Sequence, residues 1–289
     1  MATWNVLSLN RAGSLRKLKE ELTKYRIGIA AIQEIRWPGT EIMDTGDFTI
    51  LYSGSTKSVL GTGFVVSKEY KGSIMEFKPI NERICTLRIR ARFFNITLIC
   101  VHAPTEETEE EVKDKFYEEL EEVYDRAAGH DVKMILGDMN AKIGREKMYK
   151  PAIGQERIHK GSNNNGERLI DFAVSRNMIV SSTYFPHKRI HMMTWGSPDG
   201  TTFNQIDHIL IDRRHGSDVK DIRSCRGADC DSDHFIVRVK YKQRIANIRK
   251  TKGVRQKKYR VEELKKDEGV AKQYRKEIEL EIGKKGKGK

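Results

Sequence analysis

Side chains that can bind a metal ion or move a proton stand beside segments with the composition of buried strands. Residues 229–234 place three carboxylates and a histidine directly before the apolar run 235–239. The imidazole of His234 has an ordinary pKa near neutrality, and a neighbouring carboxylate such as Asp233 can orient it or hold a metal ion. An Asp–His pair also occurs in ordinary loops, so its meaning depends on what the other strand ends supply.

Further strand ends carry amide, carboxylate or imidazole groups. These are Asn5, Glu34, His102, the pair Asp138 and Asn140, and Asp207. Strand ends that meet at one sheet edge are a rigid place for such groups to converge, although each of them alone has a structural explanation, such as a tight turn over 137–140. Oxygen ligands without a cysteine or multi-histidine cluster suit a hard cation, Mg²⁺ first and Mn²⁺ as the alternative. A cation of this kind beside a histidine and an aspartate can catalyse phosphoester hydrolysis, because the metal neutralises charge on the phosphate and a side chain deprotonates water.

The net charge of +13 is concentrated near the C-terminus. Residues 244–289 contain 17 Lys and Arg against 7 Asp and Glu, which leaves a net charge of only +3 for residues 1–243. We therefore predict a nearly balanced domain over 1–243 and a basic linker or tail over 244–289 that nucleic acid or acidic proteins would attract. In the tail, 261–264 and 270–282 are expected to form a surface helix, and 283–289 to be disordered.

Composition also limits the compartment. No apolar run reaches about 18 residues, so no transmembrane helix and no membrane contact are expected. The N-terminus lacks the pattern of a secretory signal. The four cysteines show no C-x-x-C spacing, which favours reduced thiols over a zinc site. We expect a nuclear or cytoplasmic protein that is not secreted.

Hydrophobic periodicity predicts strands separated by a few helices. Strands are expected over 2–7, 27–32, 48–52, 61–67, 73–77, 84–89, 93–101, 133–136, 178–181, 193–195, 206–211, 219–224 and 235–241. Helices are expected from residue 14 to about 25, over 106–128 and over 167–176, with a loop over 141–165. We interpret the acidic run 106–111 as a solvated face. Two sheets with helices outside them would fit this order.

Five short blocks together resemble, in order, the signature of the endonuclease/exonuclease/phosphatase superfamily. They are Trp4–Asn5–Val6, Gln33–Glu34, Gly137–Asp138–Met139–Asn140, Ile206–Asp207–His208 and Ser232–Asp233–His234. Further blocks are similar to the endonuclease domain of RTE-type non-LTR retrotransposons and to craniofacial development protein 2-like sequences. They are His102–Ala103–Pro104–Thr105, Asn165–Gly166–Glu167–Arg168–Leu169 and the segment 194–207. The resemblance covers about residues 2–243.

This resemblance implies a fold and a metal site. The fold would be a four-layer α/β sandwich, in which two mostly antiparallel sheets pack face to face with helices outside. Glu34 would be the main Mg²⁺ ligand, assisted by Asn5 and Asp233. No reverse transcriptase follows within the 289 residues, so a truncated or standalone endonuclease copy is expected.

The resemblance also implies catalytic roles. Asp207 would orient His234, which acts as a base or polarises the phosphate. Asp138 would position or deprotonate the attacking water, or protonate the leaving oxygen. Asn140 would hold the scissile phosphate. His102 stands where the family often has tyrosine, and it could donate a hydrogen bond.

The leading hypothesis is a monomeric Mg²⁺-dependent DNA endonuclease that nicks one strand and leaves 3′-hydroxyl and 5′-phosphate ends. Leu7 stands where abasic-site endonucleases often carry aspartate, which argues against an abasic-repair role. One alternative is a phosphomonoesterase on the same scaffold. The other is a non-catalytic chromatin-associated or nucleic-acid-associated protein.

Overall fold

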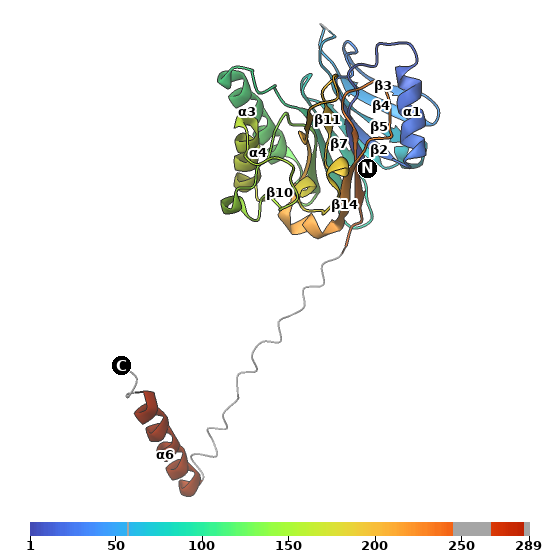
Figure 1. Cartoon of the computed structure of the whole chain (residues 1–289). Helices are drawn as coiled ribbons and strands as arrows, with labels where there is room; N and C mark the ends of the chain where they lie inside the picture. Colours follow the sequence, from blue (N-terminus) through green and yellow to red (C-terminus); the bar gives the residue numbers. More distant parts are fainter. Residues whose placement is uncertain (57, 245–266, 286–289) are drawn as a thin grey trace. The chain divides into compact units, whose positions relative to one another are not determined.

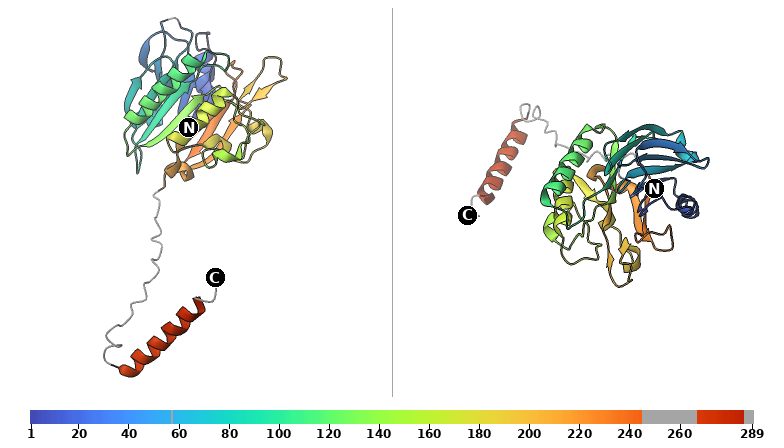
Figure 2. Two further views of the ribbon diagram at one scale, coloured as in Figure 1. Left: turned by 90° about the vertical axis from the view of Figure 1, so that its left-hand side faces the viewer. Right: turned by 90° about the horizontal axis from the view of Figure 1, so that it is seen from above.

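Two β-sheets pack face to face within Met1–Arg244, which forms one of two compact units; the other is Ile245–Lys289. The structure, a computed structural model, describes residues 1–56, 58–244 and 267–285. In Figure 1, α1 lies on one side of the pair of sheets, and α3 and α4 lie on the other. Figure 2 shows α3 and α4 in front of their sheet and, from above, the succession of layers.

The first sheet has seven strands and carries both ends of the domain. Its order is β14 (Val219–Cys225), β15 (Ile236–Tyr241), β1 (Ala2–Asn5), β2 (Ile29–Gln33), β5 (Thr62–Ser67), β4 (Phe48–Ser53) and β3 (Thr40–Asp44). The pair β1–β2 is parallel, and the other neighbours are antiparallel. The last strand of the domain therefore pairs with the first.

The second sheet has six strands and repeats this plan. Its order is β10 (Met178–Val180), β13 (Asp207–Asp212), β9 (Val132–Asp138), β8 (Ile96–His102), β7 (Ile84–Ile89) and β6 (Ile74–Pro79). Here β8–β9 is the parallel pair among antiparallel neighbours. A separate short hairpin joins β11 (Trp195–Gly196) to β12 (Phe203–Asn204).

Helices cover the outer faces of both sheets. The α-helices of the first unit are α1 (Ser14–Lys24), α2 (Lys68–Lys71), α3 (Glu110–Arg126) and α4 (Asn164–Ser175). Short 3-10 turns are η1 (Lys147–Tyr149), η2 (Ser181–Thr183), η3 (Arg189–His191) and η4 (Arg213–Asp218).

Three apolar cores hold these layers together. Leu18 and Leu22 of α1 pack with Ile32 on the outer face of the seven-stranded sheet. Residues of α3 and α4, including Leu120 and Leu169, pack against the outer face of the six-stranded sheet. The third core, which includes Phe64 and Leu98, lies between the sheets. Burial of each such side chain contributes roughly 1.5–3 kcal/mol. The predicted four-layer α/β sandwich is confirmed.

Element boundaries show where the sequence pattern was misleading. Strand β3 was not predicted, because it is an exposed edge strand with three polar residues in five and no buried face. Helix α3 begins at Glu110 and not at 106. Helix α4 begins at Asn164 and not at 167, because Asn163 caps it by accepting a hydrogen bond from Gly166 N–H.

The second unit contains α6 (Glu268–Lys285), which spans the helix predicted over 270–282. The disorder expected over 283–289 is wrong for 283–285, which belong to α6. Residues 286–289 and the segment 261–264 lie outside the described residues. Among the described helices, none combines the length and apolar character that crossing a bilayer requires.

One buried carboxylate offers a test of the packing around β9. Asp131 accepts hydrogen bonds from Arg88 Nε at 2.8 Å, Arg88 Nη2 at 3.1 Å and Thr97 Oγ1 at 2.8 Å. Burial raises the pKa of Asp131, but these bonds outweigh it and lower the pKa overall. The ionised carboxylate therefore stabilises the fold above the unfolded-state pKa of about 3.9, and this contribution is lost as pH falls through the lowered pKa.

We expect Asp131→Asn to lower the free energy of unfolding by about 1–3 kcal/mol at pH 7, because charged hydrogen bonds are lost. The difference from wild type should shrink as the pH falls below the unfolded-state value. Urea unfolding at pH 7 and at pH 3 measures both quantities. An equal difference at the two pH values would contradict the assigned role of the carboxylate.

Candidate functional site

Strand register brings the predicted residues to one edge of the sandwich. Asp138 at the end of β9 is paired with His102 on β8 and with Asp207 on β13. In the other sheet, Asn5 at the end of β1 is paired with Gln33, and Glu34 follows directly. Directly paired residues present their side chains on the same face of a sheet. The two rows therefore meet across the gap between the sheets.

The amide of Asn5 joins the two rows. Its Nδ2 donates to Glu34 Oε1 at 2.9 Å and to Asp138 Oδ2 at 3.1 Å. Its Oδ1 accepts from the backbone N–H of Leu7 at 3.1 Å. The residue is completely buried. One amide group thus holds carboxylates from both sheets at a single point.

Glu34 is held in a left-handed backbone conformation, with φ of 55°. Its Oε2 accepts from Arg36 Nη2 at 2.5 Å, and its Oε1 lies 3.7 Å from His102 Nε2. Burial raises the pKa of Glu34, but His102, Asn5 and Arg36 together lower it. Glu34 is therefore an ionised carboxylate that remains partly open to solvent.

His234 is clamped between two aspartates. Its Nδ1 lies 3.0 and 3.2 Å from the two carboxylate oxygens of Asp207, and its Nε2 lies 3.6 Å from Asp138 Oδ2. The indole N–H of Trp4 donates to the His234 carbonyl at 2.9 Å. Burial lowers the pKa of His234, but the charges of Asp207 and Asp138 outweigh it and raise the pKa to about 10. In this geometry the carboxylate of Asp207 is the hydrogen-bond partner of His234 Nδ1.

The buried side chains of Asp138 and His102 have pKa values shifted in the direction that favours their uncharged forms. Burial and the nearby charge of Asp207 raise the pKa of Asp138. Burial lowers the pKa of His102, whose Nε2 lies 3.9 Å from Asp138 Oδ2. Perturbed groups that face one another at a strand edge are typical of sites that move protons.

Asn140 is held by the segments that follow the two neighbouring strands β9 and β8. It has a left-handed backbone, with φ of 48°, and its N–H donates to Asp138 Oδ1 at 3.0 Å. Its Nδ2 donates to the Ala103 carbonyl at 2.9 Å. Together with His234 and Trp195, it lines a hollow of about 320 Å³. The hollow gives a substrate access to Asn140 and His234.

The residues present fit a divalent cation. Asp233 Oδ2 accepts from Trp195 Nε1 at 2.8 Å, but its Oδ1 is buried without a hydrogen-bond partner among the described residues. A buried carboxylate oxygen is costly in free energy unless a cation or a hydrogen-bond donor pairs with it. With Glu34, Asp233 provides the oxygen donors that a hard cation prefers. Asn5 presents its NH₂ group to the carboxylates, so its oxygen would bind a cation only after the amide turned over.

A second group of side chains also has the spacing of metal ligands. Ligand atoms of Asp138, Asp207 and His234 lie within 4.8 Å of one another. The carboxylate of Asp207 already binds the His234 Nδ1 that it faces. We therefore interpret these three residues as a charged cluster, in which Asp207 is hydrogen-bonded to His234 and Asp138 lies at ion-pair distance from the other ring nitrogen. The ligand set Glu34, Asn5 and Asp233 stays a prediction.

Sequence reasoning missed several supporting residues. Arg36 pairs with Glu34, and Thr194 Oγ1 accepts from the backbone N–H of Asp207 at 3.0 Å. The indole N–H of Trp195 donates to Asp233 Oδ2. Glu106 is not part of a solvated face, because its carboxylate accepts from Asn163 Nδ2 and from the backbone N–H groups of residues 164 and 165. The tripeptide 163–165, rich in amides beside a helix start, was the available signal.

Comparisons with known proteins identify the family and the fold of the chain. The model of the endonuclease/exonuclease/phosphatase family matches residues 2–234. Craniofacial development protein 2 of Tragulus javanicus is 35% identical over 253 residues, which make up 87% of this chain and 43% of the relative. The chain thus spans less than half the length of that relative.

Two solved structures show the same fold. The 3′-5′ exonuclease NExo from Neisseria meningitidis has a TM-score of 0.61 at 20% identity, covering 84% of this chain and 99% of that chain. The endonuclease domain of TRAS1, a telomere-specific non-LTR retrotransposon, has a TM-score of 0.56 at 12% identity, covering 83% and 96%. The predicted resemblance is confirmed at the level of family and fold. The chain belongs to the endonuclease/exonuclease/phosphatase family.

Proposed function

We propose that this chain is a Mg²⁺-dependent DNA endonuclease that hydrolyses one phosphodiester bond and so nicks one strand. The observation that carries the proposal is that the Asn5 amide joins Glu34 to Asp138, and that His234 lies 3.6 Å from the same Asp138 oxygen. This edge is open to substrate through the hollow lined by His234. The Asp233 oxygen that has no hydrogen-bond partner within the described part of the chain supports a cation at the same edge.

The bound cation would neutralise charge on the phosphate oxygens. In the hydrolysis, the water oxygen bonds to phosphorus, the bond from phosphorus to the 3′ oxygen breaks, and that oxygen takes up a proton. His234, oriented by Asp207 and protonated because its pKa is raised to about 10, donates to a phosphate oxygen. Asp138 exchanges a proton with the water or with the leaving oxygen, and Asn140 holds the phosphate by its amide.

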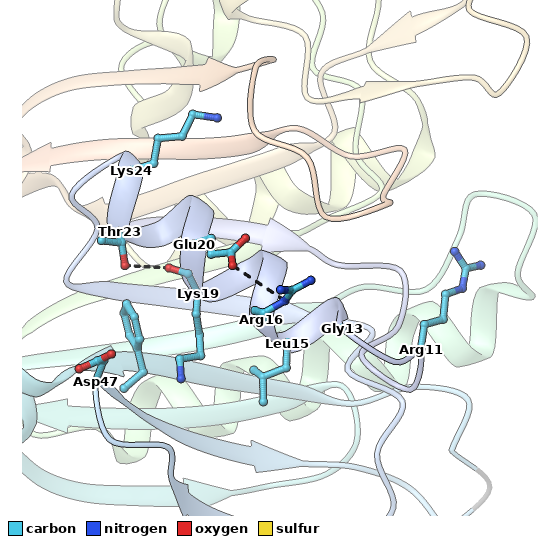
Figure 3. A pocket seen from close by; sticks show the side chains of 10 residues that line it. Arg11, Gly13, Leu15, Arg16, Lys19, Glu20, Thr23, Lys24 and Asp47 are labelled. Carbon is cyan, nitrogen blue, oxygen red and sulfur yellow. Dashed lines mark hydrogen bonds and ion pairs between the residues drawn. The ribbon is translucent and has the colours of Figure 1, made fainter.

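A groove of about 720 Å³ along α1 supports a long polyanionic substrate. Figure 3 shows that its lining carries the basic side chains of Arg11, Arg16, Lys19 and Lys24 together with the acidic Glu20 and Asp47, and that Arg16 pairs with Glu20. The segment that carries Arg11 follows β1 and is tied to the Glu34 strand end, because Leu9 N–H donates to the Ile35 carbonyl at 3.0 Å. Flanking phosphates of a duplex could therefore continue from the site onto this groove. Binding should weaken with salt, because released counterions drive it.

The test of the proposal uses supercoiled plasmid and the full chain. We expect Mg²⁺ to support conversion to the open circle and EDTA to prevent it. The nicks should carry 3′-hydroxyl ends, which a DNA polymerase extends without prior phosphatase treatment. Soluble inositol phosphates, assayed in parallel, should release no phosphate.

Two results would overturn the proposal. Release of phosphate from inositol phosphates without plasmid nicking would identify a phosphomonoesterase. Binding of DNA without cleavage in Mg²⁺ or Mn²⁺ would identify a non-catalytic protein. The monomeric state, the nuclear or cytoplasmic location and contact of the basic tail with nucleic acid stay predictions.

A further inference from the structure

Asn165 connects two catalytic segments that are distant in sequence. Its side chain is buried, with 1% of the residue exposed. Its Nδ2 donates to the Pro104 carbonyl at 3.0 Å and to the Asn140 carbonyl at 3.2 Å. One NH₂ group therefore joins the segment after His102 to the segment after Asp138.

Asn163 adds a second contact to the same carbonyl. Its Nδ2 lies 3.4 Å from the Asn140 carbonyl and 2.7 Å from Glu106 Oε2. Its Oδ1 accepts from the backbone N–H of Lys142 at 2.8 Å. Glu106 holds the start of α4 in turn, since its Oε1 accepts from Asn164 N–H at 3.0 Å. The start of α4 thus holds the backbone at the Asn140 carbonyl and at the Lys142 N–H.

We propose that Asn165 is a positioning residue for Asn140 and that it sets the direction of the Asn140 amide. This inference rests on the proposed function, in which that amide holds the scissile phosphate. The Asn140 side chain donates to the carbonyl of Ala103, which is the neighbour of Pro104. Because Asn165 binds the carbonyls of both Asn140 and Pro104, it holds the backbone of the donor Asn140 and the segment of the acceptor Ala103 together. A shift of about 1 Å at such a group can cost about 100-fold in rate.

The matched pair Asn165→Asp and Asn164→Asp tests this role. Both changes replace an amide by a carboxylate in the first turn of α4, so their effects on the helix terminus are alike. Asn165→Asp turns the donor into an acceptor that faces two carbonyl oxygens. Asn164 Oδ1 accepts from Arg168 Nε at 3.0 Å, which an aspartate also does. Asn165→Ala removes the donor without adding charge, and it keeps the test decisive if the aspartate variant does not fold.

A double-mutant cycle on plasmid nicking separates positioning from general stability. We expect Asn165→Asp or Asn165→Ala to lower kcat about 10- to 100-fold in the wild-type background. In an Asn140→Gly background, the same change should cost less than about threefold, because no side chain is left to position. Equal losses in both backgrounds, or an equal loss in Asn164→Asp, would overturn the proposal.

Hydrogen–deuterium exchange provides a readout that needs no activity. The backbone amides of residues 140–142 should exchange faster than in wild type in the Asn165 variants. Their exchange rates should be unchanged in Asn164→Asp. If the wild-type chain nicks no DNA but the Asn165 variants exchange faster, the contact between Asn165 and Asn140 is supported and the endonuclease assignment is refuted. Unchanged exchange in an active protein would refute the positioning role alone.

Discussion

Glu34→Gln is expected to abolish nicking of supercoiled plasmid, with a loss in kcat/KM of at least about 1,000-fold, because metal assistance is worth several kcal/mol. The substitution preserves the shape of the side chain and an oxygen that Asn5 Nδ2 can bond. It removes the negative charge that Arg36 and His102 face. A neutral amide binds a hard cation far less well than a carboxylate does.

The measurement compares initial nicking rates over a series of Mg²⁺ concentrations. Glu118→Gln, which makes the same chemical change on the exposed face of α3, is the matched control and should behave as wild type. Circular dichroism establishes that both variants are folded. Full nicking activity in folded Glu34→Gln would remove Glu34 from the site.

His234→Ala and Asp207→Asn are expected to lower kcat by about 100- to 10,000-fold, the range typical of proton-transfer groups. The imidazole is lost in the first variant. In the second, an amide replaces the carboxylate that lies 3.0 Å from Nδ1, so the ring loses its orienting charge. Because the two residues act as one unit, the double variant should be little worse than His234→Ala.

Single-turnover nicking by the three variants and wild type measures this coupling. His130→Ala, a change of an exposed histidine in the turn before β9, is the control and should leave the rate unchanged. If the losses multiplied in the double variant, the residues would act independently and the orienting role of Asp207 would be wrong.

Strands and the positions of their functional ends were predictable because they depend on local patterns. Asn5 and Asp138 each stand at the end of an apolar strand, and Asp207 stands at the start of one. The register that the structure shows then brings Asp138 beside Asp207. The α1 helix was predictable from Leu15, Leu18 and Leu22 at helical spacing. The order of the blocks then indicated the family.

What could not be predicted depends on contacts between segments far apart in the chain. Glu106 is one acidic residue in a run of them, and only the position of α4 distinguishes it from its exposed neighbours. The bond from Trp195 to Asp233 requires the hairpin β11–β12 to lie against the last strand. The amide orientation of Asn5 depends on carboxylates from both sheets. Local periodicity carries no information about such pairings.

The pairing of β1 with β15 has a consequence for synthesis of the chain. Trp4 binds the His234 carbonyl, and Ser232 Oγ binds the Asn5 carbonyl at 2.7 Å, so the site draws on both ends of the domain. A ribosome makes Asn5 and Glu34 early and His234 about two hundred residues later. Nascent chains that end before His234 lack both the histidine and β15, the strand that pairs with β1. The proposed activity therefore requires a chain that has been translated at least through β15.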